Sequence, residues 1–311
     1  MVTTYRLLTL AHAIEVATTL TKSWFRGHSR PVGALTPRIF RPEYHDPILT
    51  GFRPALEMEL IETFKRRAAM ITELQVPPDD DRLGWLCVMQ HYRTPTRLLD
   101  WTENLLVALH FAVSSDRGED GELWALLPWA LNEAAGAGWG IPLPGSSPVR
   151  YMLDQPYWAR TPEELAKYLE LKRPITSPLA IQPPLRFARM AVQASTFTIH
   201  PAPDGSKAIA DVLSDERHLV RYVIPGSEKQ HLQDQLRVLG ISDGQLFPDL
   251  EGLSRMIAFD NRTIAYGVPK PLSVRARLPK EVANAGPELR SPCVLGANGV
   301  GCSLTVSRRR T

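Results

Sequence analysis

The feature that most constrains the fold is a polar segment at 90–104, QHYRTPTRLLDWTEN, that runs directly into an apolar segment at 105–114, LLVALHFAVS. The apolar segment has the length of a buried helix. Asp100 or Thr102 is expected to cap its start, because a short polar side chain accepts a hydrogen bond from the first free N–H groups of a helix. A cap leaves three other side chains of this loop unexplained, namely His91, Arg97 and Trp101. The segment is therefore predicted both to start a helix and to form part of a pocket, where those N–H groups can also face an anion.

Helix-like and strand-like patterns alternate along the chain without a regular strand–helix–strand repeat. Helices are predicted at 11–22, 55–74, 82–90, 105–114, 162–171, 227–239 and 249–259, and strands at 24–27, 122–128, 197–200 and 219–225. The side chains expected to face inward from the second and third helices are Leu60, Phe64, Ala68, Leu83, Leu86 and Cys87. Asp81 is expected to cap the third helix. This mixture predicts an α+β fold, with a small mixed sheet at the core and helices around it.

The net charge of +3 is unevenly distributed over the 311 residues. Residues 275–311 hold seven basic and two acidic side chains, so this segment alone carries +5 and the rest of the chain carries −2. A body of that charge gives no support to a nucleic-acid-binding surface. From about residue 270 the chain is rich in Pro, Gly, Ala and Arg with little periodicity. We expect 269–311 to be a disordered basic tail that contacts anionic partners weakly.

Several function classes lack the residues that they need. No stretch approaches the roughly 18 apolar residues of a membrane-spanning helix, so no membrane partner is expected. The chain has three Cys and no CxxC, and its N-terminus lacks the pattern of a signal peptide, which together favour the reducing cytoplasm. No two His stand at a metal-ligand spacing, so no metal site is predicted. The glycine-rich dinucleotide motif, the phosphate-binding loop and the serine hydrolase motif are also absent.

A second unusual cluster is WFRGH at 24–28. Arg26 stands in an aromatic strand and precedes Gly27, where we expect the strand to end in a turn. Such an arginine can clamp a phosphate or carboxylate through two parallel hydrogen bonds, and the glycine would let a ligand approach the backbone closely. The alternative is a structural arginine, because a buried guanidinium must be paired with a carboxylate. The sequence leaves both interpretations open.

These segments resemble the FRG domain, a family named for its Phe/Tyr-Arg-Gly motif. The resemblance is carried by FRGH at 25–28, Leu35-Thr36-Pro37, QHYRTPTRLLDWTENLLVALHFA at 90–112 and RMAVQASTF at 189–197. It covers about 20–200 and continues more weakly to about 260. It therefore implies an FRG domain with a C-terminal helical continuation over 1–268. Arg93 and Ser195 stand where the family usually has glycine, and Leu105-Leu106 replaces its Asn-Pro.

A fainter likeness is to ADP-ribosyltransferases, in which an aromatic-Arg-Gly strand is followed by a Ser-Thr-Ser strand and then an Ala-xx-Phe-Ala helix. This likeness implies a related architecture and NAD as the substrate. Arg26 would hold the NAD pyrophosphate or the nicotinamide ribose. The ribose would be oriented by Thr96 or Thr102, and the nicotinamide would stack on Trp101 or Tyr92. Gln193 falls where the family's catalytic Glu is expected, so Asp100 is an alternative acid.

Three functions stay open. The first is transfer of ADP-ribose from NAD to an unidentified macromolecule, in a bacterial toxin or defence role that the FRG resemblance suggests. The second is a nuclease or phosphohydrolase that uses His91 and Asp100 as acid and base. The third is a non-catalytic module that binds an anionic ligand. The candidate catalytic residues are Arg26, His91, Asp100 and Gln193, and the candidate ligand-binding residues are Arg26, Gly27, Tyr92, Thr96, Arg97, Trp101 and Thr102.

Overall fold

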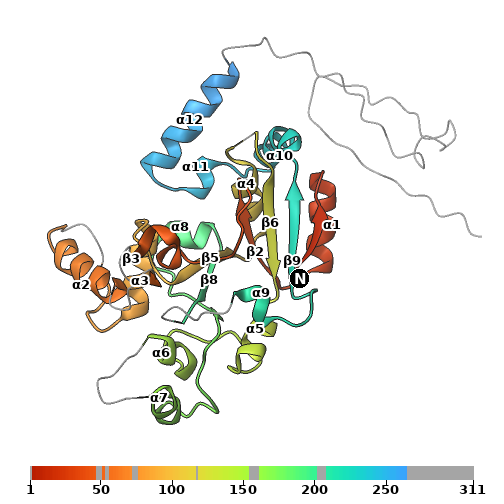
Figure 1. Ribbon diagram of the computed structural model, residues 1–311. Helices are drawn as coiled ribbons and strands as arrows, with labels where there is room; N and C mark the ends of the chain where they lie inside the picture. The colour runs from red at the N-terminus through yellow and green to blue at the C-terminus, as the bar shows by residue number, and fades with distance from the viewer. Residues whose placement is uncertain are drawn as a thin grey trace, which may run out of the picture. The chain divides into compact units, whose positions relative to one another are not determined.

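The computed structural model describes residues 2–46, 51–52, 56–71, 76–116, 118–153, 161–201 and 208–264. Its centre is a seven-stranded mixed sheet in the order β1-β9-β6-β2-β5-β8-β7 (Figure 1). The strands are β1 (Thr3–Arg6), β2 (Trp24–His28), β5 (Leu98–Thr102), β6 (Gly121–Leu126), β7 (Leu179–Ile181), β8 (Ser195–Ile199) and β9 (Leu219–Ile224). β1 runs parallel to β9, and the other neighbours are antiparallel. β3 (His45–Asp46) and β4 (Gly51–Phe52) form a separate pair. The predicted α+β class is confirmed, while the likeness to the architecture of ADP-ribosyltransferases stays a prediction.

Helices surround this sheet. They are α1 (Leu10–Thr19), α2 (Leu56–Ala68), α3 (Arg82–His91), α4 (Leu105–Val113), α5 (Pro128–Ala135), α6 (Ser147–Leu153), α7 (Pro162–Tyr168), α8 (Ala188–Val192), α9 (Ile209–Val212), α10 (Gly226–Val238), α11 (Asp243–Leu246) and α12 (Leu250–Ile264). Short 3-10 helices lie at Arg38–Phe40 and Pro42–Tyr44. All seven predicted helices are present, and six of them have both ends within five residues of the expected positions. α2 ends at Ala68, well before the predicted end at residue 74, and the predicted positions 72–74 lie outside the described residues.

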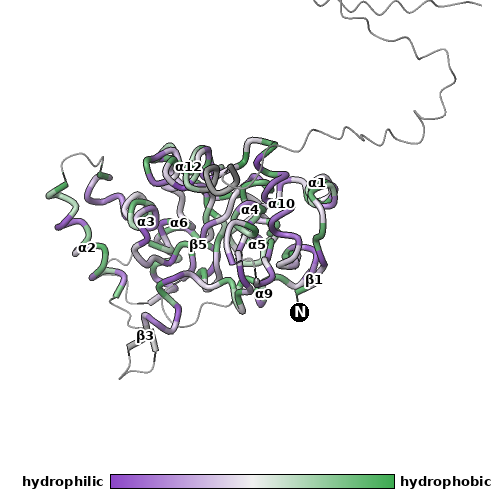
Figure 2. The backbone as a smooth tube through the Cα atoms, turned by 90° about the horizontal axis from the view of Figure 1, so that it is seen from above, coloured by the Kyte–Doolittle hydropathy of each residue, from purple (hydrophilic) through white to green (hydrophobic). Residues whose placement is uncertain are grey.

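One face of the sheet is covered at β9, β6 and β2 by α1, α4 and α10. Their buried side chains form one cluster with Phe25 of β2 and Leu123 of β6. In Figure 1, α1 lies beside β9 and α4 lies near β2, and Figure 2 shows α10 between α1 and α4 when the molecule is seen from above. α4 crosses so close to β2 that an added Cβ on Gly27 would lie 1.8 Å from the backbone oxygen of Ala108. Gly27 is therefore required for helix packing, and β2 continues through it to His28 without the expected turn.

Replacing Gly27 by alanine is expected to lower the free energy of unfolding by about 1–3 kcal/mol. The new methyl group would meet backbone atoms of α4, which cannot rotate away as a flexible side chain would. Gly33→Ala is the matched control, because nothing lies within 4 Å of an added Cβ there. Urea unfolding of both variants measures the difference, and equal midpoints would contradict the packing role.

The same face carries a second group of helices at β5, β8 and β7. Thr102 of β5 pairs with Phe25, so its side chain lies on the same face of the sheet, the α4 side. Leu98 is four residues from Thr102 on the same strand, so it also lies on the α4 side. Leu98 packs with Phe197 in a cluster that includes buried residues of α2, α3, α6 and α8. The opposite face buries Trp24, Leu99, Trp101 and Trp124 against Leu131 of α5 and Ile209 of α9. Helices thus cover both faces of the sheet.

The polar segment differs from its prediction in one respect. Leu98–Thr102 forms the central strand β5, which pairs with β8. The expectation that Asp100 or Thr102 caps α4 is therefore wrong, because both residues lie within a hydrogen-bonded strand. Asn104 is the cap, and its side-chain oxygen accepts from the backbone N–H of Leu106 at 2.9 Å. Thr102 supports the turn by accepting from the N–H of Asn104 at 3.0 Å.

The caps and burial of the next helices agree better with the sequence. Asp81 caps α3 by accepting from the N–H of Gly84 at 2.8 Å, as predicted. The expected residues of α3 are buried: Leu83, Leu86 and Cys87. In α2 the fully buried apolar position is Ile61, whereas Leu60 and Phe64 are only partly buried. Residues 1–261 make up one compact unit. The predicted basic tail, 269–311, lies entirely outside the described residues, so its disorder stays a prediction.

Candidate functional site

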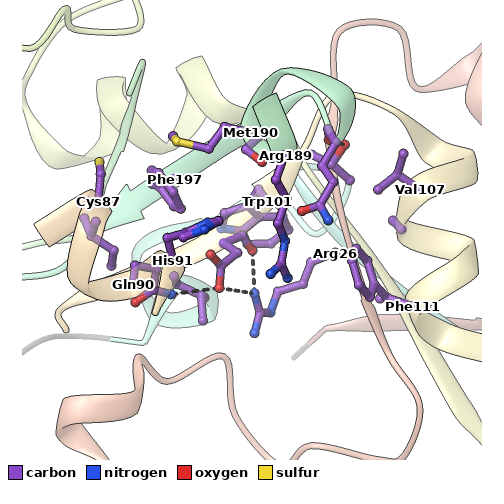
Figure 3. A pocket seen from close by; sticks show the side chains of 18 of the residues that line it. Arg26, Cys87, Gln90, His91, Trp101, Val107, Phe111, Arg189, Met190 and Phe197 are labelled. Atoms are coloured by element: carbon purple, nitrogen blue, oxygen red, sulfur yellow. Dashed lines mark hydrogen bonds and ion pairs between the residues drawn. The ribbon is translucent and has the colours of Figure 1, made fainter. Parts of the chain in front are cut away.

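A cavity of about 360 Å³ lies at β2 and β5, where it is lined by residues of the α4 face of the sheet and also by residues of the opposite face, such as Trp101. Its walls come from β2, β5, α4, the end of α3, α8 and the start of β8, together with two arginines of the segment after β2. β2 and β5 are joined at the pair Phe25–Thr102. The two groups of helices that cover the α4 face of the sheet lie on either side of the cavity. Strand order and helix packing together therefore bring residues distant in sequence to one place (Figure 3).

Arg26 holds the two central strands together inside this cavity. Its Nη1 donates to the backbone carbonyl of Asp100 at 2.6 Å and lies 3.6 Å from the Asp100 carboxylate. Its Nε donates to Nε2 of His28 at 2.9 Å. Burial lowers the pKa of the Arg26 guanidinium, Asp100 partly offsets this, and the charge of Arg41 adds to it. An arginine remains protonated in proteins even so. Arg26 is thus a largely buried cation with one nearby carboxylate.

Two neutral histidines lie near this cation. Burial, with the charges of Arg26 and Arg41, lowers the pKa of His28 to about 2. Burial and the charge of Arg26 lower the pKa of His200 to about 3. A neutral imidazole can accept the hydrogen bond from Arg26, whereas an imidazolium would donate and repel it. The surroundings of Arg26 therefore hold no second positive charge from histidine at neutral pH.

These histidines are expected to make the fold less stable in acid. The unfolded chain binds protons at both positions below about pH 6.5, while the folded chain does not until about pH 2–3. Stability is therefore lost as pH falls below about 6.5, by roughly 1.4 kcal/mol per pH unit and per histidine. Urea unfolding at pH 7.5, 6.5 and 5.5 measures this slope. The His200→Gln variant should have a shallower slope, and an unchanged slope would contradict the assignment.

Asp100 projects into the cavity from β5. Its carboxylate accepts from Nε2 of Gln90 at 2.8 Å, and Gln90 in turn accepts from the hydroxyl of Thr96 at 2.5 Å. Figure 3 shows Gln90 and Arg26 connected by dashed lines to this carboxylate. The side chain of Asp100 is 54% exposed, so it is fixed in place and still reachable by a ligand. Among the described residues that line the cavity, Asp100 is the only carboxylate.

Arginines outnumber that carboxylate. The five that line the cavity are Arg26, Arg38, Arg41, Arg93 and Arg189. They repel one another: Arg41 lowers the pKa of Arg26, and burial followed by the charge of Arg93 lowers the pKa of Arg189. Like charges gathered beside one carboxylate favour the binding of an anion. Four of these arginines, Arg38, Arg41, Arg93 and Arg189, were not predicted as site residues. The short spacing of Arg38 and Arg41 and the position of Arg93 inside the polar segment are the signals in the sequence that point to them.

Arg97 is a structural residue. Its guanidinium is paired with the Glu57 carboxylate and also donates to the carbonyl of Met152 at 3.1 Å. The backbone N–H of Arg97 donates to the same Glu57 carboxylate at 3.1 Å. Arg97 does not line the cavity, nor do Thr96 and Tyr92. Thr96 is fully buried beneath Gln90, and Tyr92 lies at the surface with half of its area exposed. None of these three residues is placed to touch a ligand in the cavity.

The remaining predicted residues do line the cavity: Gly27, His91, Trp101, Thr102 and Gln193. Trp101 packs in the cluster on the opposite face, and its indole donates to Thr198 at 3.2 Å. The Thr102 hydroxyl donates to the carbonyl of Gln193 at 2.6 Å. The Gln193 amide donates to the carbonyl of Leu246 at 2.9 Å, so its nitrogen is engaged. These contacts connect β5, the turn before β8 and α11.

His91 lies at the cavity wall with its ring stacked on Phe187, the centroids 4.1 Å apart. Burial, with the nearby charge of Arg189, lowers the pKa of His91, which makes it neutral at neutral pH. A neutral imidazole can accept a proton. Within the described part of the chain, no group of three or more His, Cys, Asp or Glu is placed to hold a metal ion. None of the described helices is both long and apolar enough to cross a membrane.

Comparison with known families identifies one segment. The model of the FRG domain family matches residues 21–121, which run from just before β2 to the first residue of β6. No curated protein and no solved structure matches the chain. The matched segment supplies most of the cavity, including Arg26 and Asp100, while α8 and β8 add Arg189 and the residues around Gln193 from outside it.

Proposed function

Since the chain carries an FRG domain with an arginine-lined cavity, we propose that this cavity binds NAD and that the protein transfers ADP-ribose from NAD to a macromolecule. The observation that carries the proposal is the set of five arginines around a single carboxylate, Asp100. A pyrophosphate suits that charge, because guanidinium groups bind phosphate oxygens through paired hydrogen bonds. The family match gives the domain, and the choice of NAD rests on this chemistry and on the order of Arg26, β5 and α4 along the chain.

Arg26 and Arg41 are the inner anchors of the proposed pyrophosphate. Arg26 is immobilised by His28 and by the carbonyl of Asp100, so little conformational entropy is lost when it binds a phosphate. Arg41 is held through Nε, which donates to the carbonyl of Thr36 at 3.2 Å and leaves the Nη groups for a ligand. Preorganised donors of this kind bind anions more tightly than mobile surface lysines.

In the proposed reaction, the bond between ribose C1′ and the nicotinamide nitrogen breaks, and both electrons leave with nicotinamide. C1′ then forms a bond to an oxygen or nitrogen of the acceptor, which releases a proton. Positive charge develops on the ribose, and Asp100 supplies the negative charge that stabilises it. Gln193 is neutral and donates to Leu246, so it contributes no such charge. His91 is neutral and lines the cavity, which suits it to accept the released proton.

A second candidate is hydrolysis of a phosphate ester with His91 as the base. The observation that favours it is that His91 and Asp100 line the same cavity among arginines that can bind a phosphate. The two reactions differ in the bond that is cleaved: C1′–N in the first and P–O in the second. Products therefore distinguish them directly.

The test is incubation of the full chain with NAD labelled in its adenylate phosphate, together with a cell extract. Transfer is expected to place the label on protein or nucleic acid and to release nicotinamide. Arg26→Ala should abolish both signals, whereas Arg217→Ala, an exposed arginine paired with Asp215, should leave them unchanged. Unchanged NAD and no measurable binding would refute the proposal. Binding without turnover would favour a non-catalytic module, and phosphate-ester cleavage that His91→Ala abolishes would favour the hydrolase.

A further inference from the structure

Arg93 occupies a backbone position that favours glycine. α3 ends in a turn in which the N–H of Arg93 donates to the carbonyl of Gln90 at 3.0 Å and the N–H of Thr94 donates to that of Met89 at 2.8 Å. Such a turn needs a left-handed residue after the helix, and Arg93 has φ of 62°. The same turn ends α10 with Gly240, at φ of 80°. An arginine at this position is strained relative to glycine.

This strained position places a charged side chain on the cavity wall. Arg93 lines the cavity, and its carbonyl accepts from Nη1 of Arg38, another lining arginine, at 2.7 Å. The acidic neighbour of Arg93 is Glu251 at 3.9 Å, and both side chains are about two-thirds exposed. An exposed pair at that distance contributes little. The charge of Arg93 is therefore largely available to a ligand.

The charge of the cavity exceeds that of the proposed pyrophosphate. Five arginines and one aspartate give a formal excess of four positive charges, and His91 adds none at neutral pH. The pyrophosphate of a dinucleotide brings about two negative charges, and a further phosphate monoester brings about −1.5 to −2 at pH 7. A ligand with this third phosphate would neutralise the excess positive charge of the lining residues. Once Arg26 and Arg41 hold the pyrophosphate, the outer arginines remain to bind the third phosphate.

We propose that Arg93 is a specificity-determining residue that binds an additional phosphate on the ligand, so that the preferred substrate is a dinucleotide carrying a third phosphate group, as in 2′-phosphorylated NAD. This inference rests on the proposed function. Arg93 acts with Arg38 at the outer part of the cavity, while Arg26 acts on the pyrophosphate that both forms of the dinucleotide share. The strained backbone at Arg93 places this charge on the cavity wall.

The test compares the affinities of NAD and 2′-phosphorylated NAD by calorimetry for the wild-type protein and Arg93→Gly. The wild type is expected to bind the phosphorylated form about tenfold more tightly, and Arg93→Gly should bind both forms equally. Relief of the left-handed strain should also raise the Tm of this variant by about 2–4 °C. Glu170→Gly is the matched control, because Glu170 ends α7 in the same turn at φ of 56° and does not line the cavity. It should gain stability with no change in either affinity.

The outcomes separate this inference from the proposed function. Equal binding of both dinucleotides by the wild type, or a preference that survives in Arg93→Gly, would overturn the role of Arg93 and leave NAD binding intact. Failure of the wild type to bind either dinucleotide would refute the proposed function and this inference with it. A preference lost in Arg93→Gly and kept in Glu170→Gly supports the proposal.

Discussion

Replacing Glu57 by glutamine is expected to lower the free energy of unfolding by about 3–5 kcal/mol, because it leaves the Arg97 guanidinium buried without a counter-charge. The residues Glu57 and Arg97 are 2% and 6% exposed. The carboxylate also accepts the backbone N–H of Arg97, so it fixes the residue immediately before β5. Loss of this pair should therefore disturb the strand that carries Asp100.

The control is a double variant in which both charges are removed, Glu57→Gln with Arg97→Met, because the glutamine oxygen can still accept the backbone N–H of residue 97. No buried charge is left unpaired in this double variant, so it should recover most of the stability that Glu57→Gln loses. Urea unfolding monitored by tryptophan fluorescence measures all three proteins. A glutamine variant as stable as the wild type would show that the ion pair does not stabilise the fold. Arg97 would then again be a candidate ligand-binding residue.

The role of Arg97 shows where sequence reasoning reached its limit. Arg97 stands in the polar segment and Arg26 in an aromatic strand, and either arginine could be an anion clamp or part of a buried ion pair. The choice depends on a carboxylate distant in sequence. Glu57 looks like an acidic first-turn residue on the surface of α2, yet it is buried against Arg97, 40 positions along the chain. No local pattern contains that contact.

Local features were predicted more successfully because their causes are local. The Asp81 cap and the buried face of α3 depend on neighbours within one helix turn, and both agree with the structure. The local pattern did not predict the strand β5, because residues 94–104 are rich in capping and turn residues and only pairing with β8 makes Leu98–Thr102 a strand. Gly27 was predicted to let a ligand approach the backbone. The structure shows instead that a glycine is needed there because the backbone of α4 lies too close for a side chain.

The cavity was predicted in part. The polar segment and Arg26 were expected to meet, and the structure places Arg26, His91 and Asp100 on one cavity. The additional arginines come from a 3-10 turn, from a helix end and from α8, each of which has its own local explanation in the sequence. Their convergence depends on the order β2-β5-β8 in the sheet, which a single sequence does not reveal.

Asp100→Asn is expected to reduce ADP-ribose transfer by about 10²–10³-fold, the range typical for loss of one preorganised electrostatic group. The side chain keeps its size and can still accept from Gln90, but it loses the negative charge that the proposed transition state needs. Binding of NAD should be unchanged or tighter, because the only carboxylate among the described lining residues no longer repels the pyrophosphate. A fall in turnover without a fall in affinity is the signature of a group that acts in the transition state.

Asp249→Asn is the matched control for this variant. Asp249 lies close enough to influence His91 and Arg189 electrostatically, but it does not line the cavity. Asn preserves its cap on α12, where Asp249 accepts from the N–H of Gly252 at 2.8 Å. Calorimetry with NAD and nicotinamide release measured on both variants separate affinity from turnover. Equal turnover in the two variants would remove Asp100 from catalysis and contradict the proposed electrostatic stabilisation of the ribose, because no other lining residue among those described can supply the negative charge.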